Sequence, residues 1–252
     1  MEVFGLDIGG SGVKGAPVDV ETGELKAKRK RLVTPQPATP EAVLETAAGL
    51  VRHFGWDGPV GCGFPAVIKA GVAQTAANVD ASTVGFDFGG RLQATLGMPV
   101  WTVNDADAAG LAEVRWGAGR DVDGTVLMLT LGTGIGTALF TGGRLVPNTE
   151  LGHIELRGMD AETYASAAAR ERENLSWRKF AGRFNEYLEA IERLLWPDRI
   201  IVGGGASKKA DKLFPHLETR AEIFPAKLLN SAGIAGAALA ATEAASTAPA
   251  NS

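Results

Sequence analysis

The sequence predicts an α/β protein made of two similar halves, and two observations carry this prediction. Short apolar runs rich in β-branched residues alternate with segments that carry helix signals along the 252 residues, which is typical of α/β folds. A strand, a glycine-rich turn and a second strand stand near the N-terminus, and the same pattern returns later. A shift that places Gly9 on Gly132 also places Leu6 on Leu129. We therefore expect a duplicated architecture, with two similar α/β domains around a central cleft.

The composition is that of a globular protein. Hydrophobic residues make up 45%, charged residues 21%, and the formal net charge is -4, so nothing global points to nucleic acid or to an anionic membrane surface. Glycines and charges interrupt the apolar stretches well before roughly 18 residues, which argues against a membrane-spanning helix. The N-terminal residues lack the pattern of a secretory signal. The only cysteine, Cys62, excludes an internal disulfide, and we expect a cytoplasmic protein.

The first glycine-rich turn follows a buried strand expected over residues 3–8. It leads into another strand and not into a helix, which excludes the Rossmann fingerprint and the Walker loop, because both open a helix. Glycines let backbone N–H groups approach a phosphate closely, and Asp7 at the strand end could hold a hydrated Mg²⁺. An ordinary glycine-rich hairpin is the alternative. The candidate phosphate contacts here are Gly9, Gly10, Ser11, Gly12 and Lys14.

Helix and strand signals place the remaining elements. Thr39-Pro40-Glu41 combines an N-cap residue, a proline in the first turn and an early acid, which predicts a helix start. The alternating basic segment 24–32 predicts a solvated edge strand, because lysines and arginines discourage edge-to-edge pairing, and a site for a polyanion is the alternative. Further strands are expected over residues 60–64, 98–103, 126–131 and 199–202, and helices over 40–54, 106–116, 161–173, 177–196 and from 232.

Asn104 and Asp105 stand between the strand expected over 98–103 and the helix that follows. A carboxylate at a strand end and a helix start lies at the rim of a cleft, near the positive end of the helix dipole. That position suits a base that must stay ionised. The alternative is that one of the two residues is only an N-cap.

Two further segments carry candidate site residues. Glu150, His153 and Glu155 stand beside a glycine, and this mixture of carboxylates and an imidazole suits a ligand rich in hydroxyl groups. Near residue 203, a strand is followed by glycines and a helix, whose N-terminal amides could face an anion or a nucleotide. The candidate phosphate contacts in this half are Gly132, Thr133, Gly134, Gly136, Gly204, Gly205, Lys208 and Lys209.

Five of these motifs, in order, resemble the ROK family of sugar kinases, and the resemblance covers residues 3 to about 241. It implies the actin-like ATPase (ribonuclease H-like) fold. Residues 7–12 resemble the family's first phosphate loop, and residues 131–136 its second. Asn104-Asp105 resembles the pair that holds the sugar and supplies the base. Residues 150–153 match the Glu-x-Gly-His sugar motif, and residues 201–205 match the loop for the nucleotide or distal phosphate.

The sequence departs from the family at one informative place. Most members continue from Glu-x-Gly-His into a cysteine-rich zinc motif, whereas no cysteine follows Cys62 here, so a thiolate zinc site cannot form. Residues 161–166 still resemble the segment after the lost motif. The resemblance therefore implies Glu162 as a sugar ligand and His153 as a sugar contact without metal. Members with this shortened segment are typical of the branch that uses polyphosphate.

The resemblance implies transfer of a phosphoryl group to the 6-hydroxyl of glucose, with inorganic polyphosphate, and also ATP, as candidate donors. Asp105 would accept the hydroxyl proton, and Mg²⁺ with both glycine loops would neutralise the transferred group. The expected partners are these substrates and a second copy in a homodimer, without nucleic acid or membrane. The implied sugar-binding residues are Asn78, Asn104, Asp105, Glu150, His153 and Glu162.

Three alternatives stay open: an ATP-dependent hexokinase for another hexose or amino sugar, a sugar-responsive repressor, and a silent sugar-binding protein. The third glycine loop is residues 203–205. For polyphosphate, Lys208, Lys209 and Lys212 after this loop and a second basic group form a candidate track, and solvated helix faces are the alternative. That second group is Arg170, Arg172, Arg178, Lys179 and Arg183. The expected domains are 1–103 and 104–230, with a C-terminal helix over 231–245 packing back on the first domain and a disordered tail over 246–252.

Overall fold

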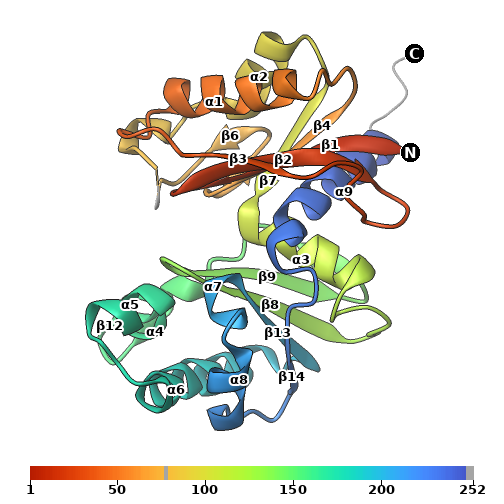
Figure 1. The fold of residues 1–252 in the computed structure, drawn as a ribbon. Helices are drawn as coiled ribbons and strands as arrows, with labels where there is room; N and C mark the ends of the chain where they lie inside the picture. Colours follow the sequence, from red (N-terminus) through yellow and green to blue (C-terminus); the bar gives the residue numbers. More distant parts are fainter. Residues whose placement is uncertain (77–78, 248–252) are drawn as a thin grey trace. The chain divides into compact units, whose positions relative to one another are not determined.

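The structure is a computed structural model that describes residues 1–76 and 79–247. The chain forms two compact units. Unit 1 comprises Met1–Ala112 and Ser231–Ser252, and unit 2 comprises Glu113–Asn230. Figure 1 shows the start of the chain in red and its last helix in blue within the same unit. Among the described residues, no helix combines the length and apolar character needed to cross a membrane.

Unit 1 is built on a mixed sheet with the order β3-β2-β1-β4-β7. β1 pairs antiparallel with β2 and parallel with β4, which in turn pairs parallel with β7. The carboxyl ends of three neighbouring strands therefore meet at one sheet edge. The strands are β1 (Glu2–Gly9), β2 (Gly12–Asp19), β3 (Lys30–Leu32), β4 (Val60–Phe64) and β7 (Val100–Asn104), with β5 (Ile68–Lys69) and β6 (Val72–Ala73) in a separate hairpin.

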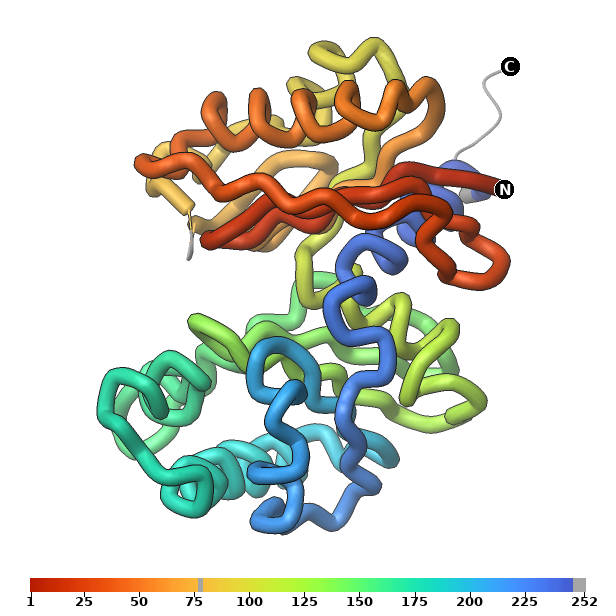
Figure 2. Tube along the Cα trace, viewed as in Figure 1, coloured from red at the N-terminus to blue at the C-terminus, as the bar shows by residue number. Residues whose placement is uncertain are grey.

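The two faces of this sheet are covered in different ways. On one face, large side chains such as Phe4 and Leu6 pack in a core with α1 (Pro40–His53) and α2 (Phe88–Leu96). On the other face, glycines replace side chains and α9 (Ala232–Thr247) lies directly on the strands. A Cβ at Gly5 would lie 2.0 Å from the carbonyl oxygen of Ile234. The tube view shows α9 in blue beside the red first strand (Figure 2).

Unit 2 repeats the sheet of unit 1. Its order is β10-β9-β8-β13-β14, with the first pairs antiparallel and the last two parallel. Each strand thus has a counterpart in the other sheet, which confirms the predicted duplication. The strands are β8 (Thr125–Leu131), β9 (Ile135–Thr141), β10 (Arg144–Val146), β13 (Arg199–Gly203) and β14 (Glu222–Pro225), with β11 (Glu155–Leu156) and β12 (Met159–Asp160) in a hairpin.

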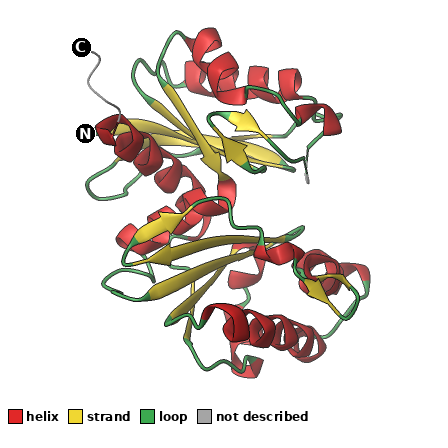
Figure 3. Ribbon diagram, turned by 180° about the vertical axis from the view of Figure 1, so that it is seen from behind, coloured by secondary structure: helices red, strands yellow, loops and turns green. Residues whose placement is uncertain are grey.

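The main helix of unit 2 is α6 (Trp177–Leu195), as the sequence predicts. Its buried residues, including Phe180, Phe184 and Ile191, recur at helical spacing and pack in a core with the strands. Figure 3 shows this helix in red beside the yellow sheet strands of its unit. The remaining elements are α3 (Asp105–Trp116), α4 (Ala161–Ala165), α5 (Ala167–Arg172), α7 (Gly204–Ser207), α8 (Ala210–Leu213), η1 (Ala81–Thr83), η2 (Leu151–His153), η3 (Phe214–His216) and η4 (Leu229–Ser231).

Three expected elements differ in the structure. The helix expected over 161–173 breaks at Ser166, whose backbone is extended and whose hydroxyl caps α5 by accepting the Ala169 N–H. The basic segment 24–32 forms a strand only over Lys30–Leu32. The helix after the third glycine loop is two short helices, α7 and α8.

The boundaries of the units also differ from the expected domains. The division falls inside α3 after Ala112, because the first half of this helix packs in unit 1. A Cβ at Gly236 of α9 would lie 1.6 Å from the carbonyl oxygen of Ala108. The C-terminal helix belongs to unit 1 and continues to Thr247, beyond the expected end at 245, and the rest of the expected tail lies outside the described residues.

Candidate functional site

Loop 1 (residues 9–14) is the turn between β1 and β2. Its ends pair directly, Gly9 opposite Gly12. Two side chains from the segment after β2 hold its backbone: Thr34 Oγ1 donates to the Gly9 carbonyl at 2.6 Å, and Arg31 donates to the Ser11 carbonyl at 2.5 Å. A Cβ at Gly12 would meet the Arg31 guanidinium at 2.5 Å. Glycine at this position therefore lets a cation lie against the loop.

Asp7 at the end of β1 has one engaged oxygen. Its Oδ2 accepts a charge-assisted hydrogen bond from Lys14 Nζ at 2.8 Å, and the side chain is 16% exposed. Within the described part of the chain, no hydrogen bond engages its Oδ1. A carboxylate with one available oxygen fits Mg²⁺, which binds proteins through one or two carboxylates and completes its shell with water and substrate phosphates.

Asn104 and Asp105 differ in their contacts. Asn104 Oδ1 accepts the backbone N–H groups of Ala106 and Asp107 at 2.9 and 3.1 Å, so Asn104 is the N-cap of α3. Its amide nitrogen donates to the Ala66 carbonyl at 3.1 Å, and the residue is buried. Asp105 is partly buried, with Oδ1 accepting the Ala106 N–H at 2.9 Å. The sequence did not show which of the two residues caps the helix, and the structure shows that it is Asn104.

The strand register of unit 1 brings Asp105 to the same sheet edge as loop 1. Asp7 lies opposite Gly63 of β4, and the next residue of β4, Phe64, lies opposite Asn104 of β7. A Cβ at Gly63 would stand 3.5 Å from the Cα of Asp105. The absence of a side chain at Gly63 allows the start of α3 to approach the central strands.

Loop 2 (residues 132–136) is the corresponding turn of unit 2. A carboxylate from α4 holds it: Glu162 Oε2 accepts the Ile135 N–H at 3.1 Å, and a Cβ at Gly134 would lie 2.0 Å from that oxygen. The third glycine loop lies against the start of loop 2. Gly204 has φ +76°, and a Cβ there would lie 2.5 Å from the Leu131 carbonyl oxygen, so only glycine fits at this position.

The Glu-x-Gly-His segment is fixed to β9. Thr137 Oγ1 donates to the Thr149 carbonyl at 2.6 Å and accepts the Leu151 N–H at 3.2 Å. Gly152 approaches loop 2 so closely that a Cβ would lie 2.1 Å from the Ile135 carbonyl oxygen. The turn that carries Glu150 and His153 therefore packs directly against loop 2.

Four side chains gather at this turn: Glu150, His153, Asp160 and Glu162, called the acidic–histidine cluster below. His153 Nδ1 is 2.7 Å from Asp160 Oδ2, and His153 Nε2 is 3.7 Å from Glu150 Oε2. Burial lowers the pKa of His153, but the hydrogen bond to Asp160 and the surrounding carboxylates outweigh it and hold the pKa above its usual value. The pKa of Glu150 is raised, mainly by burial. The neighbouring His153 lowers this pKa, whereas the carboxylate of Glu162 raises it further.

The cluster also contains a possible cation site. His153, Asp160 and Glu162 offer ligand atoms that lie within 4.8 Å of one another. A structural zinc site typically has four protein ligands in a tetrahedral arrangement, whereas this cluster offers three nitrogen and oxygen ligands. Two of the carboxylate oxygens are already taken by backbone N–H groups, those of Ile135 and of Glu162 itself.

The predicted cationic track divides into two groups. Lys208, Lys209 and Lys212 are exposed, and no side-chain hydrogen bond or ion pair engages them in the described chain. Several arginines of the second group are engaged within unit 2: Arg172 and Arg183 both pair with Glu173, and Arg170 stacks on Trp177 at 4.0 Å from the ring centroid. Arg178 and Lys179 are exposed.

The structure adds two residues that sequence reasoning missed, Arg31 at loop 1 and Asp160 in the cluster. Arg31 lies in a basic segment for which a solvated edge strand is the main prediction and a polyanion site the alternative. Asp160 had a signal, because an aspartate directly before the start of α4 is an N-cap. Glu155, expected near His153, is exposed without a side-chain partner in the described chain. Asn78 lies outside the described residues.

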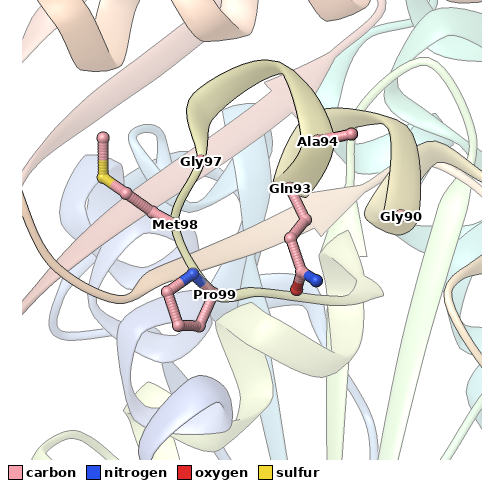
Figure 4. Close-up of a pocket in the computed structure, with 6 residues that line it drawn as sticks. All are labelled: Gly90, Gln93, Ala94, Gly97, Met98 and Pro99. Carbon is pink, nitrogen blue, oxygen red and sulfur yellow. The ribbon is translucent and has the colours of Figure 1, made fainter.

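A pocket of about 420 Å³ lies elsewhere in unit 1, beside α2 (Figure 4). Its lining contains no charged side chain and none of the predicted site residues. The lining residues are Gly90, Gln93, Ala94, Gly97, Met98 and Pro99.

Comparisons with known proteins identify the relatives of this chain. It is 51% identical to a polyphosphate glucokinase of Mycobacterium tuberculosis (strain CDC 1551 / Oshkosh), over 94% of this chain and 90% of the relative. An inorganic polyphosphate/ATP-glucomannokinase from Arthrobacter sp. strain KM matches with a TM-score of 0.94 at 50% identity, over 96% of this chain and 99% of the other.

A ROK family glucokinase from Streptomyces griseus, solved with glucose and AMPPNP, matches with a TM-score of 0.81 at 25% identity, over 96% of this chain and 100% of the other. The protein therefore has the actin-like ATPase fold of these kinases. The profile of the ROK family itself matches residues 3–168. The chain belongs to the ROK family.

Proposed function

We propose that this protein is a glucokinase that transfers a phosphoryl group from inorganic polyphosphate, and also from ATP, to the 6-hydroxyl of glucose. The observation that carries the proposal is the partly buried carboxylate of Asp105 at the same sheet edge as Asp7 and loop 1, next to a residue that already caps α3. Relatives named polyphosphate glucokinase and polyphosphate/ATP-glucomannokinase, each about half identical, support the donor and the acceptor.

Asp105 is the proposed general base, which takes the proton of the attacking sugar hydroxyl. A positioned base contributes typically ~10²–10⁴ in rate. Asn104 holds the start of α3 through its two accepted hydrogen bonds and is assigned to the sugar through its remaining amide hydrogen. In unit 2, Glu150, His153 and Glu162 are assigned to sugar hydroxyls, because carboxylates accept hydrogen bonds and a neutral imidazole both donates and accepts.

The phosphoryl group is assigned to the glycine loops. Backbone N–H groups of loops 1 and 2 are the candidate donors, and Lys14 is the candidate side chain in loop 1. Mg²⁺, held by Asp7 through water, would neutralise charge on the transferred group. We expect no structural zinc, so protein purified without added zinc should contain far less than one zinc per chain.

A second candidate is a kinase for another hexose, because the same hydroxyl-binding groups serve several sugars. The relative named glucomannokinase favours mannose among these sugars. We also expect a homodimer in the cytoplasm, and light scattering of the purified protein over a range of concentrations tests the assembly.

The test is a panel of sugars and donors. The purified chain is assayed with glucose, mannose and N-acetylglucosamine, each with long-chain polyphosphate or ATP, with and without Mg²⁺. We expect glucose 6-phosphate from both donors, and no turnover without Mg²⁺. Absence of activity with polyphosphate would leave an ATP-dependent hexokinase, and absence of phosphorylation of any sugar would overturn the proposal.

A further inference from the structure

The β11–β12 hairpin brings Asp160 to His153, seven positions earlier in the chain. Their contact, Nδ1 to Oδ2 at 2.7 Å, is at the lower end of the range for a charge-assisted hydrogen bond. The other oxygen of Asp160 accepts the Glu162 N–H at 3.1 Å, as the N-cap of α4. A single carboxylate thus fixes both the imidazole and the start of the helix that carries Glu162.

This arrangement determines where the imidazole proton lies. An ionised carboxylate only accepts hydrogen bonds, so the proton of a neutral His153 ring must be on Nδ1. Nε2 is then an acceptor. The neighbouring acceptor, Glu150 Oε2, lies 3.7 Å from Nε2. Two acceptors at this separation match two neighbouring hydroxyl groups of one ligand, each of which donates one hydrogen bond.

We propose that Asp160 is a positioning residue for the sugar: it holds His153 in the Nδ1–H tautomer, so that Nε2 accepts a hydrogen bond from a sugar hydroxyl. The inference rests on the proposed function, because it takes a sugar as the ligand of the cluster. It assigns to Asp160 a role that the sequence motif does not contain.

The charges around His153 make the proposed contact between its Nε2 and the sugar depend on pH. The carboxylates facing the ring are Glu150, Asp160 and Glu162, and against its burial they hold the pKa of His153 above its usual value. When His153 is protonated, Nε2 becomes a donor directed at Glu150 and no longer accepts from a sugar. We therefore expect glucose binding to weaken as pH falls through this raised pKa. Protonation favours the folded state, so this contribution to stability is complete below the ordinary pKa and is lost as pH rises through the raised one.

Asp160→Asn is the decisive variant. Asparagine is as good an N-cap as aspartate, so its carbonyl oxygen can keep the bond to the Glu162 N–H. Its NH₂ group then faces His153 and forces Nδ1 to accept, which places the proton on Nε2. We expect the glucose KM to rise about tenfold or more, as loss of a charge-assisted hydrogen bond predicts, with a smaller change in kcat and in the KM for the donor.

Three further measurements separate positioning from a merely structural role. At a pH above the raised pKa of His153, where the ring is neutral, imidazole ¹⁵N NMR should show its proton on Nδ1 in the unmodified protein and on Nε2 in Asp160→Asn. The acid limb of kcat/KM for glucose should move to lower pH in the variant. Glu155→Gln is the matched control: Glu155 lies opposite Asp160 in the hairpin and is exposed, and its variant should keep the glucose KM.

The outcomes distinguish this inference from the proposed function. If the unmodified protein phosphorylates glucose but the neutral His153 ring, above its raised pKa, carries its proton on Nε2, the inference is wrong and the kinase assignment stands. This measurement needs no variant. An unchanged glucose KM in folded Asp160→Asn would also overturn it. So would stoichiometric zinc that is lost in the variant, because a metal would then orient the ring. An unmodified protein inactive with every sugar would instead remove the proposed function.

Discussion

Asn104 and Asp105 are neighbours in the chain, yet their side chains make different contacts. Asn104 is buried, its oxygen accepts two helix N–H groups and its nitrogen donates to the Ala66 carbonyl. Asp105 is partly buried, and its Oδ1 accepts the backbone N–H of the next residue, Ala106. Because Asn104 caps the helix, the carboxylate of Asp105 is not required for that purpose and can serve as a base close to the positive end of α3.

Asp105→Asn should therefore lower kcat by at least about 10². The amide cannot accept the hydroxyl proton, whereas it keeps the size and shape of the carboxyl group, so glucose binding should stay measurable by calorimetry. Steady-state kinetics with saturating glucose and donor give the kcat.

Asp57→Asn is a suitable control for this variant, because Asp57 is an exposed residue of the same unit. Asp107 would be a poor control, since it is buried and its replacement can destabilise the protein. An Asp105→Asn enzyme that keeps more than a tenth of the kcat would contradict the assignment of the base.

Single residues differ in how far the sequence predicts them. Glu150 and His153 stand in a short contiguous motif, so their proximity follows from local spacing. Asp160 contacts His153 only because of the β11–β12 hairpin, and Arg31 reaches loop 1 across the β2–β3 pairing. Such contacts depend on tertiary register, which a single sequence does not reveal. These site roles remain predictions for the experiments above.

At the scale of elements, α3 is fixed at its C-terminal end by a buried acid. Glu113 is fully buried, and its carboxylate accepts three backbone N–H groups, those of Ala118, Lys227 and Leu228, at 2.7 to 3.1 Å. The last turn of α3 is thereby joined to the segment before η4, within unit 2. Gly117 is required beside it, because a Cβ there would lie 2.0 Å from the Glu113 carboxylate.

Glu113→Gln should lower the free energy of unfolding by about 1–3 kcal/mol, the usual cost of leaving a buried polar group without a partner. The NH₂ group of glutamine cannot accept, so at least one of the three N–H groups loses its acceptor. Urea denaturation followed by circular dichroism measures the change. Glu189→Gln on α6, at an exposed position, should change stability by less than about 0.5 kcal/mol; equal effects of the two variants would contradict the role of Glu113.

Elements with a clear periodic pattern were predictable, and elements interrupted by local capping were not. α6 follows its apolar spacing, and α1 begins at Pro40 with Thr39 as its N-cap, as predicted. The break between α4 and α5 was missed, because the helix propensity of the flanking alanines hides the cap made by Ser166. The basic segment is shortened to β3 because continuous pairing with β2 extends only over Lys30–Leu32, whereas Leu25 makes an isolated bridge to Val18 of β2.

At the scale of the whole molecule, the duplication was predictable because the glycine turns recur at one spacing, and both sheets share one topology. The boundary between the units was not predictable, because it lies inside a helix. The first half of α3 packs in unit 1 because Gly63 and Gly236 have no side chains. No residue pattern within α3 predicts this packing.

The overall charge of the protein affects how it can bind an anionic phosphoryl donor. The net charge is -4, so binding of a long polyanion requires a local group of cations. Arg172 and Arg183 are engaged with Glu173, which leaves Lys208 and Lys209 as the stronger candidates. Polyphosphate has no base to recognise, whereas ATP also offers its adenine to a pocket. Loss of these lysines should therefore affect polyphosphate more than ATP.

The double variant Lys208→Ala/Lys209→Ala should raise the KM for long polyphosphate more than the KM for ATP and leave the glucose KM unchanged. In the unmodified protein, the KM for polyphosphate should rise steeply with salt. The slope meant here is that of the logarithm of this KM against the logarithm of the salt concentration. By analogy with nucleic-acid phosphates, it should fall by about one per lysine removed. Lys26→Ala/Lys28→Ala removes the same charge from exposed positions of unit 1 and should change neither quantity. Equal effects on both donors would exclude a polyphosphate track at these lysines.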